Sequence, residues 1–179
     1  MGLLNIKTEE LHKYSGENII VTNYKPTHIN KGNVKMIYLN RGTFIDDCPS
    51  YINSLCHRIK TLEFNSILIG GLGLGNIANW VDTNTSCSKI DVIENESEII
   101  TWVSESNHLS SDINIIEGDA FEYNTTSSYD LILMDLWWDV GSNYDNEELK
   151  LITNYSSSLN ENGSLYFPIS GKVLNLELI

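Results

Sequence analysis

The stretch Ser66–Trp80, "SILIGGLGLGNIANW", carries a short apolar run into glycines at positions 70, 71, 73 and 75. The apolar run predicts a buried strand, and the residues after the last glycine have the spacing of a helix. Glycines between a strand and a helix let the backbone turn tightly and approach a ligand closely, because no Cβ intrudes. We therefore predict a ligand-binding turn that includes Gly71, Gly73 and Gly75.

The spacing of these glycines departs from two common nucleotide-binding patterns. The dinucleotide fingerprint G-x-G-x-x-G requires a glycine where Asn76 stands, which makes a nicotinamide dinucleotide less favoured. A phosphate-binding loop ends in Gly-Lys-Ser/Thr, and no such triplet follows. The ligand expected at this turn therefore need not carry phosphate.

From Ser66 onward, short apolar runs alternate with longer mixed segments, which is the pattern of a parallel βαβ arrangement. The predicted strands are "SILIGG", "KIDVIE", "INIIEG", "DLILMD" and "SLYFPI". The predicted helices are "GNIANWVD", "NESEIITWVSES" and "NEELKLITNYSSSLN", the last with Leu149, Ile152 and Tyr155 on its buried face. The expected fold class is α/β, an open, doubly wound, mostly parallel sheet. Such sheets bind ligands at the carboxyl ends of their strands.

Residues 1–48 and residues 49–179 differ in pattern. The first segment contains short β-rich runs, "ENIIVTNYKP" and "NVKMIYLNRG", bounded by turn residues, and is predicted to form a small β-hairpin region. Residues 49–179 form the predicted Rossmann-like nucleoside-binding domain. It begins with a helix over Ser50–Thr61, and "VLNLELI" is expected as one last strand at the sheet edge.

Two acidic side chains are expected at the ends of the second and third strands of this sheet. "KIDVIE" ends on Glu94, where a carboxylate can accept both ribose hydroxyls of a bound nucleoside. After the third strand, Asp119 and the Ala120 backbone lie beside the adenine position, with an acceptor for an exocyclic amine and a donor for a ring nitrogen. Either acid alone also fits an ordinary strand end or turn. The prediction therefore depends on an ordered set of three features, in which the glycine turn, Glu94 and Asp119 follow one another at successive strand ends.

This ordered set resembles the class I methyltransferase-like fold, which binds S-adenosylmethionine, from Asn65 to Ile169. Upstream, "VKMIYLNRGTFIDDCPSYINSLCHRI" followed by "SILIGGLGLG" is similar to the spermidine synthase family, in which an N-terminal hairpin, a Tyr-containing helix and a glycine loop occur in this order. The resemblance implies a transferase that uses S-adenosylmethionine or its decarboxylated form. It also implies a substrate-binding role for Tyr51.

The strand "DLILMD" delivers Asp135 to the sheet edge, followed by Trp137, Trp138 and Asp139. In the spermidine synthases this strand end carries a catalytic aspartate and then a second acid that holds the amine. The resemblance gives these roles to Asp135 and, with altered spacing, to Asp139. A carboxylate here can orient an amine and accept its proton as the nitrogen attacks. Trp137 and Trp138 either stack on a cationic substrate or fill the core or an interface.

The glycine loop of the synthases carries an Asp where this chain has Gly73. In that family the acid recognises the amine of decarboxylated S-adenosylmethionine and disfavours the carboxylate of the ordinary form. Because Gly73 lacks this discriminating acid, methyl transfer from S-adenosylmethionine to a small amine is the first expectation. An aminopropyltransferase acting on a polyamine with the decarboxylated form is the alternative. A non-catalytic nucleoside-binding or scaffold protein is the third.

The chain has 24 acidic and 11 basic residues, a net charge of −13. This charge disfavours nucleic acid and anionic membranes as partners. It would attract small cationic molecules such as an amine, but an acidic surface that keeps the protein soluble is the more common explanation, so charge alone selects no substrate. The cysteines lack paired short spacings and the histidines are scattered, so no metal is expected. No signal-peptide pattern opens the chain and no apolar run approaches the length of about 20 residues that a membrane span needs, so a cytoplasmic location is expected. An exposed sheet edge predicts a homo-oligomer.

Overall fold

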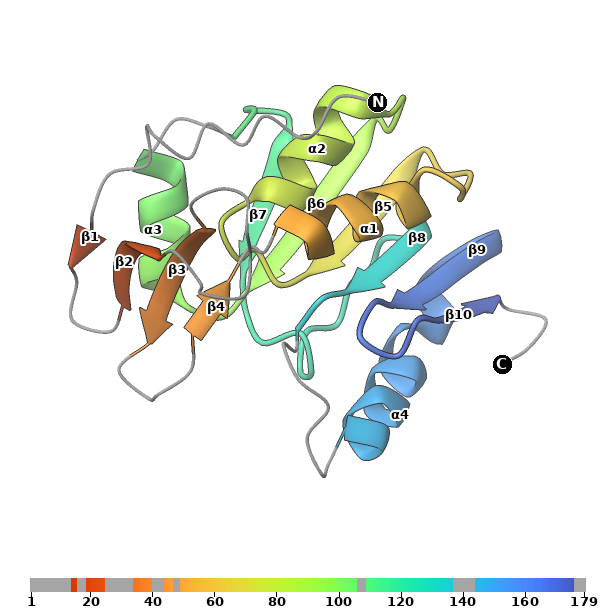
Figure 1. Ribbon diagram of the computed structural model, residues 1–179. Coiled ribbons are helices and arrows are strands. Elements are labelled where there is room, and N and C mark those ends of the chain that lie inside the picture. Colours follow the sequence, from red (N-terminus) through yellow and green to blue (C-terminus); the bar gives the residue numbers. More distant parts are fainter. Residues whose placement is uncertain are drawn as a thin grey trace.

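The computed structural model of the chain describes residues 14–15, 19–24, 34–39, 44–46, 49–105, 109–136 and 144–175, with side chains from Tyr51 onward. Its main element is a six-stranded sheet in the order β10-β9-β8-β5-β6-β7 (Figure 1). The strands are β5 (Ser66–Gly70), β6 (Lys89–Glu94), β7 (Ile113–Glu117), β8 (Tyr129–Met134), β9 (Leu159–Phe167) and β10 (Lys172–Asn175). Strands β5 to β9 are parallel, and β10 is the predicted edge strand, antiparallel to β9.

The strand order reverses at β5, which lies at the middle of the sheet. The chain adds β6 and β7 on one side of β5 and then crosses back to add β8 and β9 on the other. Ile67 and Ile69 of β5 face one side of the sheet, and Leu68 faces the other. Both sides are buried, which explains why the parallel strands are nearly continuous apolar runs. Ligands of open α/β sheets bind beside such a reversal, at the carboxyl ends of the strands.

Helices cover both faces of this sheet (Figure 1). They are α1 (Pro49–Ile59), α2 (Asn76–Asn84), α3 (Ser97–Glu105) and α4 (Tyr144–Tyr155). Buried residues of α1, α2 and α3 form one core cluster with the face that bears Ile67. Buried residues of α4 form a second cluster with the face that bears Leu68. The predicted open, doubly wound, mostly parallel sheet is therefore confirmed.

A second, antiparallel sheet precedes α1. Its strands, in the order β1-β2-β3-β4, are β1 (Tyr14–Ser15), β2 (Ile19–Tyr24), β3 (Val34–Leu39) and β4 (Phe44–Asp46). The register of β2 on β3 pairs Ile19 with Leu39 and Tyr24 with Val34. This sheet agrees with the β-rich pattern of the region, whereas a domain boundary at residue 48 stays a prediction.

The buried face of α4 differs from the predicted one. Of the predicted residues, Tyr155 is buried, Ile152 is partly buried and Leu149 is 61% exposed. Tyr144 and Glu148 are buried on the same face as Tyr155. These three residues follow the i, i+4, i+11 spacing of one helix face. Glu148 tolerates burial because its carboxylate forms an ion pair with Lys172 Nζ at 2.9 Å. The prediction was based on the spacing of apolar residues, and that spacing does not indicate a buried ion pair.

The strand after α4 begins earlier than predicted. β9 starts at Leu159, after a 3-10 turn over Ser156–Ser158, so the end of "NEELKLITNYSSSLN" is not α-helical. A Cβ on Gly163 of β9 would lie 2.9 Å from the Asn160 carbonyl oxygen and 3.0 Å from that of Tyr129. The longer strand therefore depends on a close backbone approach that only glycine permits.

None of the helices in the described ranges is long and apolar enough to span a bilayer.

Candidate functional site

Backbone hydrogen bonds join the carboxyl ends of four neighbouring strands, β8, β5, β6 and β7. The bonds run from Asp135 N–H to Gly70 O (2.9 Å), from Gly71 N–H to Ile93 O (2.9 Å) and from Gly118 N–H to Glu94 O (2.8 Å). They continue the strand pairing one step beyond the regular ladders. As a result, the sequence-predicted residues Gly71, Glu94 and Asp135 lie side by side along one edge, with Asp119 directly after Gly118.

The glycine turn has the backbone conformation that its sequence indicated. Gly71, Gly73 and Gly75 all have positive φ, at 94°, 53° and 78°. A Cβ on Gly71 would also lie 2.6 Å from the carbonyl oxygen of Asp135. Glycine at position 71 is therefore required by the packing of the turn against the end of β8, in addition to any ligand. Gly75 directly precedes α2, so the turn leads into the N-terminus of that helix.

Glu94 ends β6 and is only 7% exposed. Its Oε2 accepts the Leu72 N–H at 3.0 Å, and its Oε1 accepts the Glu96 N–H at 2.9 Å. The side chain thus connects the glycine turn with the residues before α3, a contact that the sequence did not indicate. Each carboxylate oxygen has a second lone pair, so Glu94 can still accept two ribose hydroxyls while it holds the turn.

Asp119 and Ala120 form a tight turn after β7. The exposed Asp119 accepts the Phe121 N–H on its Oδ1 at 2.8 Å, and its backbone oxygen accepts the N–H groups of Glu122 and Tyr123. Ala120 is buried, with 4% exposure. The second carboxylate oxygen of Asp119 remains an acceptor of the kind that an exocyclic amine requires.

Asp135 directly follows β8 and meets the first turn of α1. The Tyr51 hydroxyl donates a 2.6 Å hydrogen bond to Asp135 Oδ1, across 84 residues of sequence. Burial of this carboxyl raises its pKa from 3.8 to about 6, and the hydrogen bond from Tyr51 opposes that rise. The two residues assigned to catalysis and substrate binding are thus brought together. Trp137, Trp138 and Asp139, the other predicted residues, lie outside the described residues.

Three residues of α4 contact the turn after β7, and the sequence pattern did not indicate this. They are Lys150, Asn154 and Tyr155, which contact Glu122, Phe121 and Ala120 respectively. Helical spacing placed Tyr155 on the buried face, but a periodic pattern does not identify the partner of a hydroxyl group. The sequence indicated only that the Tyr155 hydroxyl would be buried and would therefore need a hydrogen-bond partner.

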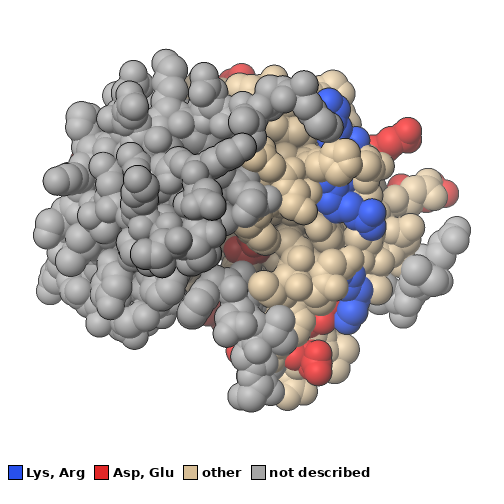
Figure 2. Space-filling view, viewed as in Figure 1, with Lys and Arg blue, Asp and Glu red and all other residues tan. Residues whose placement is uncertain are grey.

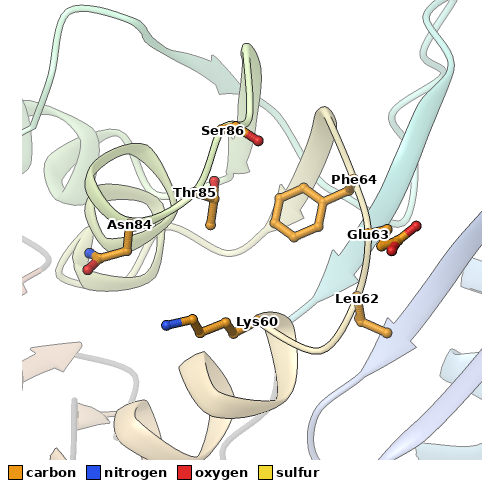
Figure 3. A pocket seen from close by; sticks show the side chains of 7 residues that line it. All are labelled: Lys60, Leu62, Glu63, Phe64, Asn84, Thr85 and Ser86. Carbon is orange, nitrogen blue, oxygen red and sulfur yellow. The ribbon is translucent and has the colours of Figure 1, made fainter. Parts of the chain in front are cut away.

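A pocket of about 360 Å³ lies at the opposite end of the strands (Figure 3). It is formed where α1 and α2 end and where the chain enters β5, and Phe64 and Thr85 face each other across it. The lining residues are Lys60, Leu62, Glu63, Phe64, Asn84, Thr85 and Ser86. None of the predicted site residues borders it, so this pocket is separate from the candidate site.

Charged side chains are mixed on the part of the surface that Figure 2 shows in colour. Basic side chains lie in a row down this face, and acidic side chains lie around them. The net charge of −13 therefore does not form one continuous acidic patch in this view. Within the described ranges, no three His, Cys, Asp or Glu side chains are grouped as a metal site.

Comparisons with known proteins identify the fold. No protein-family model and no curated protein matches the sequence. Among solved structures, the N-methyltransferase NodS from Bradyrhizobium japonicum matches with a TM-score of 0.52 and 17% identity, over 66% of this chain and 67% of that one. The fold is that of class I methyltransferases.

Two further solved structures match the same share of the chain. DesVI from Streptomyces venezuelae matches with a TM-score of 0.51 and 14% identity, over 66% of this chain and 49% of that one. Coclaurine N-methyltransferase, bound to N-methylheliamine and S-adenosylhomocysteine, matches with a TM-score of 0.50 and 20% identity, over 66% of this chain. The matched part spans only 33% of coclaurine N-methyltransferase. The likeness to the spermidine synthase branch stays a prediction.

Proposed function

We propose that this protein binds S-adenosylmethionine along the carboxyl edge of its sheet and transfers the methyl group to a small amine. The observation that carries the proposal is the row of joined strand ends, which brings Gly71, Glu94 and Asp135 side by side with Asp119 next in line. Two proteins with the same fold, NodS and coclaurine N-methyltransferase, are N-methyltransferases with structures in complex with S-adenosylhomocysteine.

The proposed cofactor roles follow the order of the strands. The turn through Gly71, Gly73 and Gly75 approaches the methionine part and the ribose. Glu94 accepts the ribose hydroxyls on the lone pairs that the backbone contacts leave available. Asp119 accepts a hydrogen bond from the exocyclic amine of adenine, and the Ala120 N–H donates one to a ring nitrogen.

The proposed chemistry uses Asp135 as a base. The cationic amine gives a proton to the Asp135 carboxylate, which frees the lone pair of the nitrogen. The nitrogen attacks the methyl carbon of the sulfonium, the carbon–sulfur bond breaks, and its electron pair stays on sulfur to give S-adenosylhomocysteine. With a pKa of about 6, this carboxyl is largely ionised at neutral pH and is a stronger base than an ordinary aspartate. We propose Asp139 as its helper and Trp137 and Trp138 as groups that contact the cationic amine.

One observation favours the aminopropyl alternative. The contact between Tyr51 and Asp135 joins the helix and the strand end that resemble the spermidine synthases. Against it, Gly73 stands where that family has an acid that selects the decarboxylated cofactor. Methyl transfer is therefore the first proposal. Other expectations from the sequence stay predictions: a cationic partner, the lack of nucleic-acid or membrane partners, a cytoplasmic location and a homo-oligomer.

Calorimetric titration with S-adenosylmethionine and with its decarboxylated form tests the proposal directly. We expect the ordinary form to bind more tightly, and we expect Glu94→Ala to weaken its binding by at least about tenfold, since hydrogen bonds to a charged group are lost. Glu117→Ala is the matched control, because Glu117 ends the neighbouring strand in register with Glu94 but is exposed.

Each alternative has a distinct outcome in these experiments. A preference for the decarboxylated form, with spermidine formed from putrescine and detected by product mass, would replace methyl transfer by aminopropyl transfer. No binding of either form would leave the scaffold hypothesis. An equal loss in Glu94→Ala and Glu117→Ala would remove Glu94 from the proposed ribose site.

A further inference from the structure

The turn after β7 has two successive peptide groups that are each hydrogen-bonded on both sides. The group between Ala120 and Phe121 donates its N–H to Asp119 Oδ1 at 2.8 Å. Its carbonyl oxygen accepts the Tyr155 hydroxyl, also at 2.8 Å. Because a peptide group is planar, fixing its carbonyl also fixes the direction of its N–H. A continuous chain of hydrogen bonds therefore runs from α4 through one peptide group to the Asp119 carboxylate.

The next peptide group repeats the arrangement. The carbonyl oxygen of Phe121 accepts the Asn154 side-chain amide at 2.8 Å, and the Glu122 N–H donates to the Asp119 backbone oxygen at 3.0 Å. Asn154 and Tyr155 are adjacent on α4, so one end of the helix holds both groups. The carboxylate and the backbone of Asp119 are thereby oriented from the same side.

The hydrogen bond from Tyr155 can hold the Ala120 carbonyl oxygen in one position. Its side chain is 0% exposed and the hydrogen bond is buried. Burial raises the pKa of Tyr155, so the hydroxyl keeps its proton and stays a donor at neutral pH. A buried hydrogen bond in a linked chain is stronger and more directional than an exposed one. The ion pair of Lys150 with Glu122 is exposed and contributes little by comparison.

We propose that Tyr155 and Asn154 are positioning residues that orient Asp119 and so determine the preference for a 6-amino purine over a 6-oxo purine. This inference rests on the proposed binding of S-adenosylmethionine, in which Asp119 accepts the amine of adenine. A 6-oxo purine presents an oxygen acceptor to the same carboxylate, and two facing acceptors repel. The discrimination depends on the direction of the carboxylate, which the hydrogen bonds from α4 control.

The test compares S-adenosyl-L-homocysteine with S-inosyl-L-homocysteine, which has an oxygen in place of the 6-amino group and a proton on the neighbouring ring nitrogen. The ring proton is the same for the wild type and the variants, so a change in discrimination between them reports on the orientation of Asp119. Calorimetry gives the ratio of their dissociation constants for the wild type and for Tyr155→Phe, which removes only the hydroxyl group. The ratio is the dissociation constant of the inosine ligand divided by that of the adenine ligand. We expect it to exceed one in the wild type and to fall by about fivefold in Tyr155→Phe, the effect of one hydrogen bond.

Tyr129→Phe is the matched control. Tyr129 belongs to the same core cluster, is 1% exposed, and donates its hydroxyl to Asp91 Oδ2 at 2.6 Å, away from the turn. We expect this variant to lose thermal stability much as Tyr155→Phe does, with an unchanged ratio. If Tyr155→Phe fails to fold, Asn154→Ala takes its place, with Asn160→Ala as the control. Asn160 donates an amide hydrogen bond to Asp130 at 2.7 Å, at the opposite edge of the sheet.

The outcomes separate this inference from the proposed function. If the wild type binds neither ligand, the proposed cofactor is wrong and the inference fails with it. If the wild type binds the adenine ligand but does not discriminate, or if Tyr155→Phe weakens both ligands equally, the proposed function survives and the positioning role is overturned. A ratio that falls in Tyr155→Phe and Asn154→Ala, but in neither control, supports the positioning role.

Discussion

The two ends of β8 carry the same residue in opposite environments. Asp130, at the start of the strand, accepts hydrogen bonds from the Asn65 N–H, the Ser66 N–H, the Ser66 hydroxyl and the Asn160 amide, at 2.7 to 2.9 Å. Asp135, just past the end of the strand, accepts one from Tyr51 within the described part of the chain. The pKa of Asp130 is lowered, chiefly by Asn160, whereas burial raises that of Asp135 to about 6.

This difference distinguishes a structural carboxylate from one that is available for chemistry. The partners of Asp130 come from the residues at the start of β5 and from β9, so it fastens three strands together and its oxygens are occupied. Among the described residues, Asp135 is desolvated without a matching set of donors, and the charged form therefore has a higher free energy in the folded protein. A carboxylate in that condition gains most from a proton or from a cationic ligand.

The largest expected effect comes from removing the charge at the carboxyl end. We expect Asp135→Asn to lower kcat for methyl transfer by about 100-fold or more, because the proton acceptor is lost. Binding of S-adenosylmethionine should change little, since Glu94 and Asp119 are the residues proposed to hold the nucleoside. The measurements are single-turnover kinetics and calorimetry on the same preparation. Full activity in Asp135→Asn would remove Asp135 from the proposed mechanism.

The second effect is one of stability and arises at the other end of the strand. We expect Asp130→Ala to lower the free energy of unfolding by about 2 kcal/mol, because backbone donors at the start of β5 lose their acceptor. The pKa of Asp130 is below its usual value of 3.8, so its contribution is present above that pH and is lost as the pH falls through the lowered pKa.

Urea denaturation at neutral and acidic pH measures this effect, and kcat of the folded variant supplies the contrast. Activity per folded molecule should match the wild type, because Asp130 lies at the opposite edge from the site. A variant that folds stably but loses activity would contradict the assignment of Asp130 as purely structural.

The sequence allowed the fold and the row of strand ends to be predicted, because both depend on local pattern. Apolar runs separated by helical segments define the sheet, and the rule that ligands bind at carboxyl ends selects Asp135 over Asp130 within the single segment "DLILMD". The positive φ angles at Gly71, Gly73 and Gly75 follow from the same local logic.

Contacts between distant segments were beyond the reach of such patterns. Tyr51 meets Asp135 across 84 residues, and Tyr155 meets Ala120 across 35. Each contact depends on where the crossovers place whole elements, and no spacing rule specifies it. The burial of Glu148 in place of Leu149 has the same origin, because its partner Lys172 belongs to β10.

The smallest expected effect concerns the hydrogen bond that Asp135 accepts from Tyr51. Asp135 must be ionised to receive a proton, so its titration should make kcat/KM rise with pH through about 6, in addition to the rise that deprotonation of the amine gives. The bond from Tyr51 favours the ionised form, and its removal in Tyr51→Phe should move this rise to higher pH by less than about one unit. Rates measured with one amine from about pH 5 to about pH 8 show the shift, because the titration of the amine is common to both proteins. Tyr129→Phe, whose hydroxyl contacts Asp91 instead, should keep the wild-type profile. A shift to lower pH in Tyr51→Phe would mean that the tyrosine stabilises the protonated carboxyl, which would contradict the role given to this hydrogen bond.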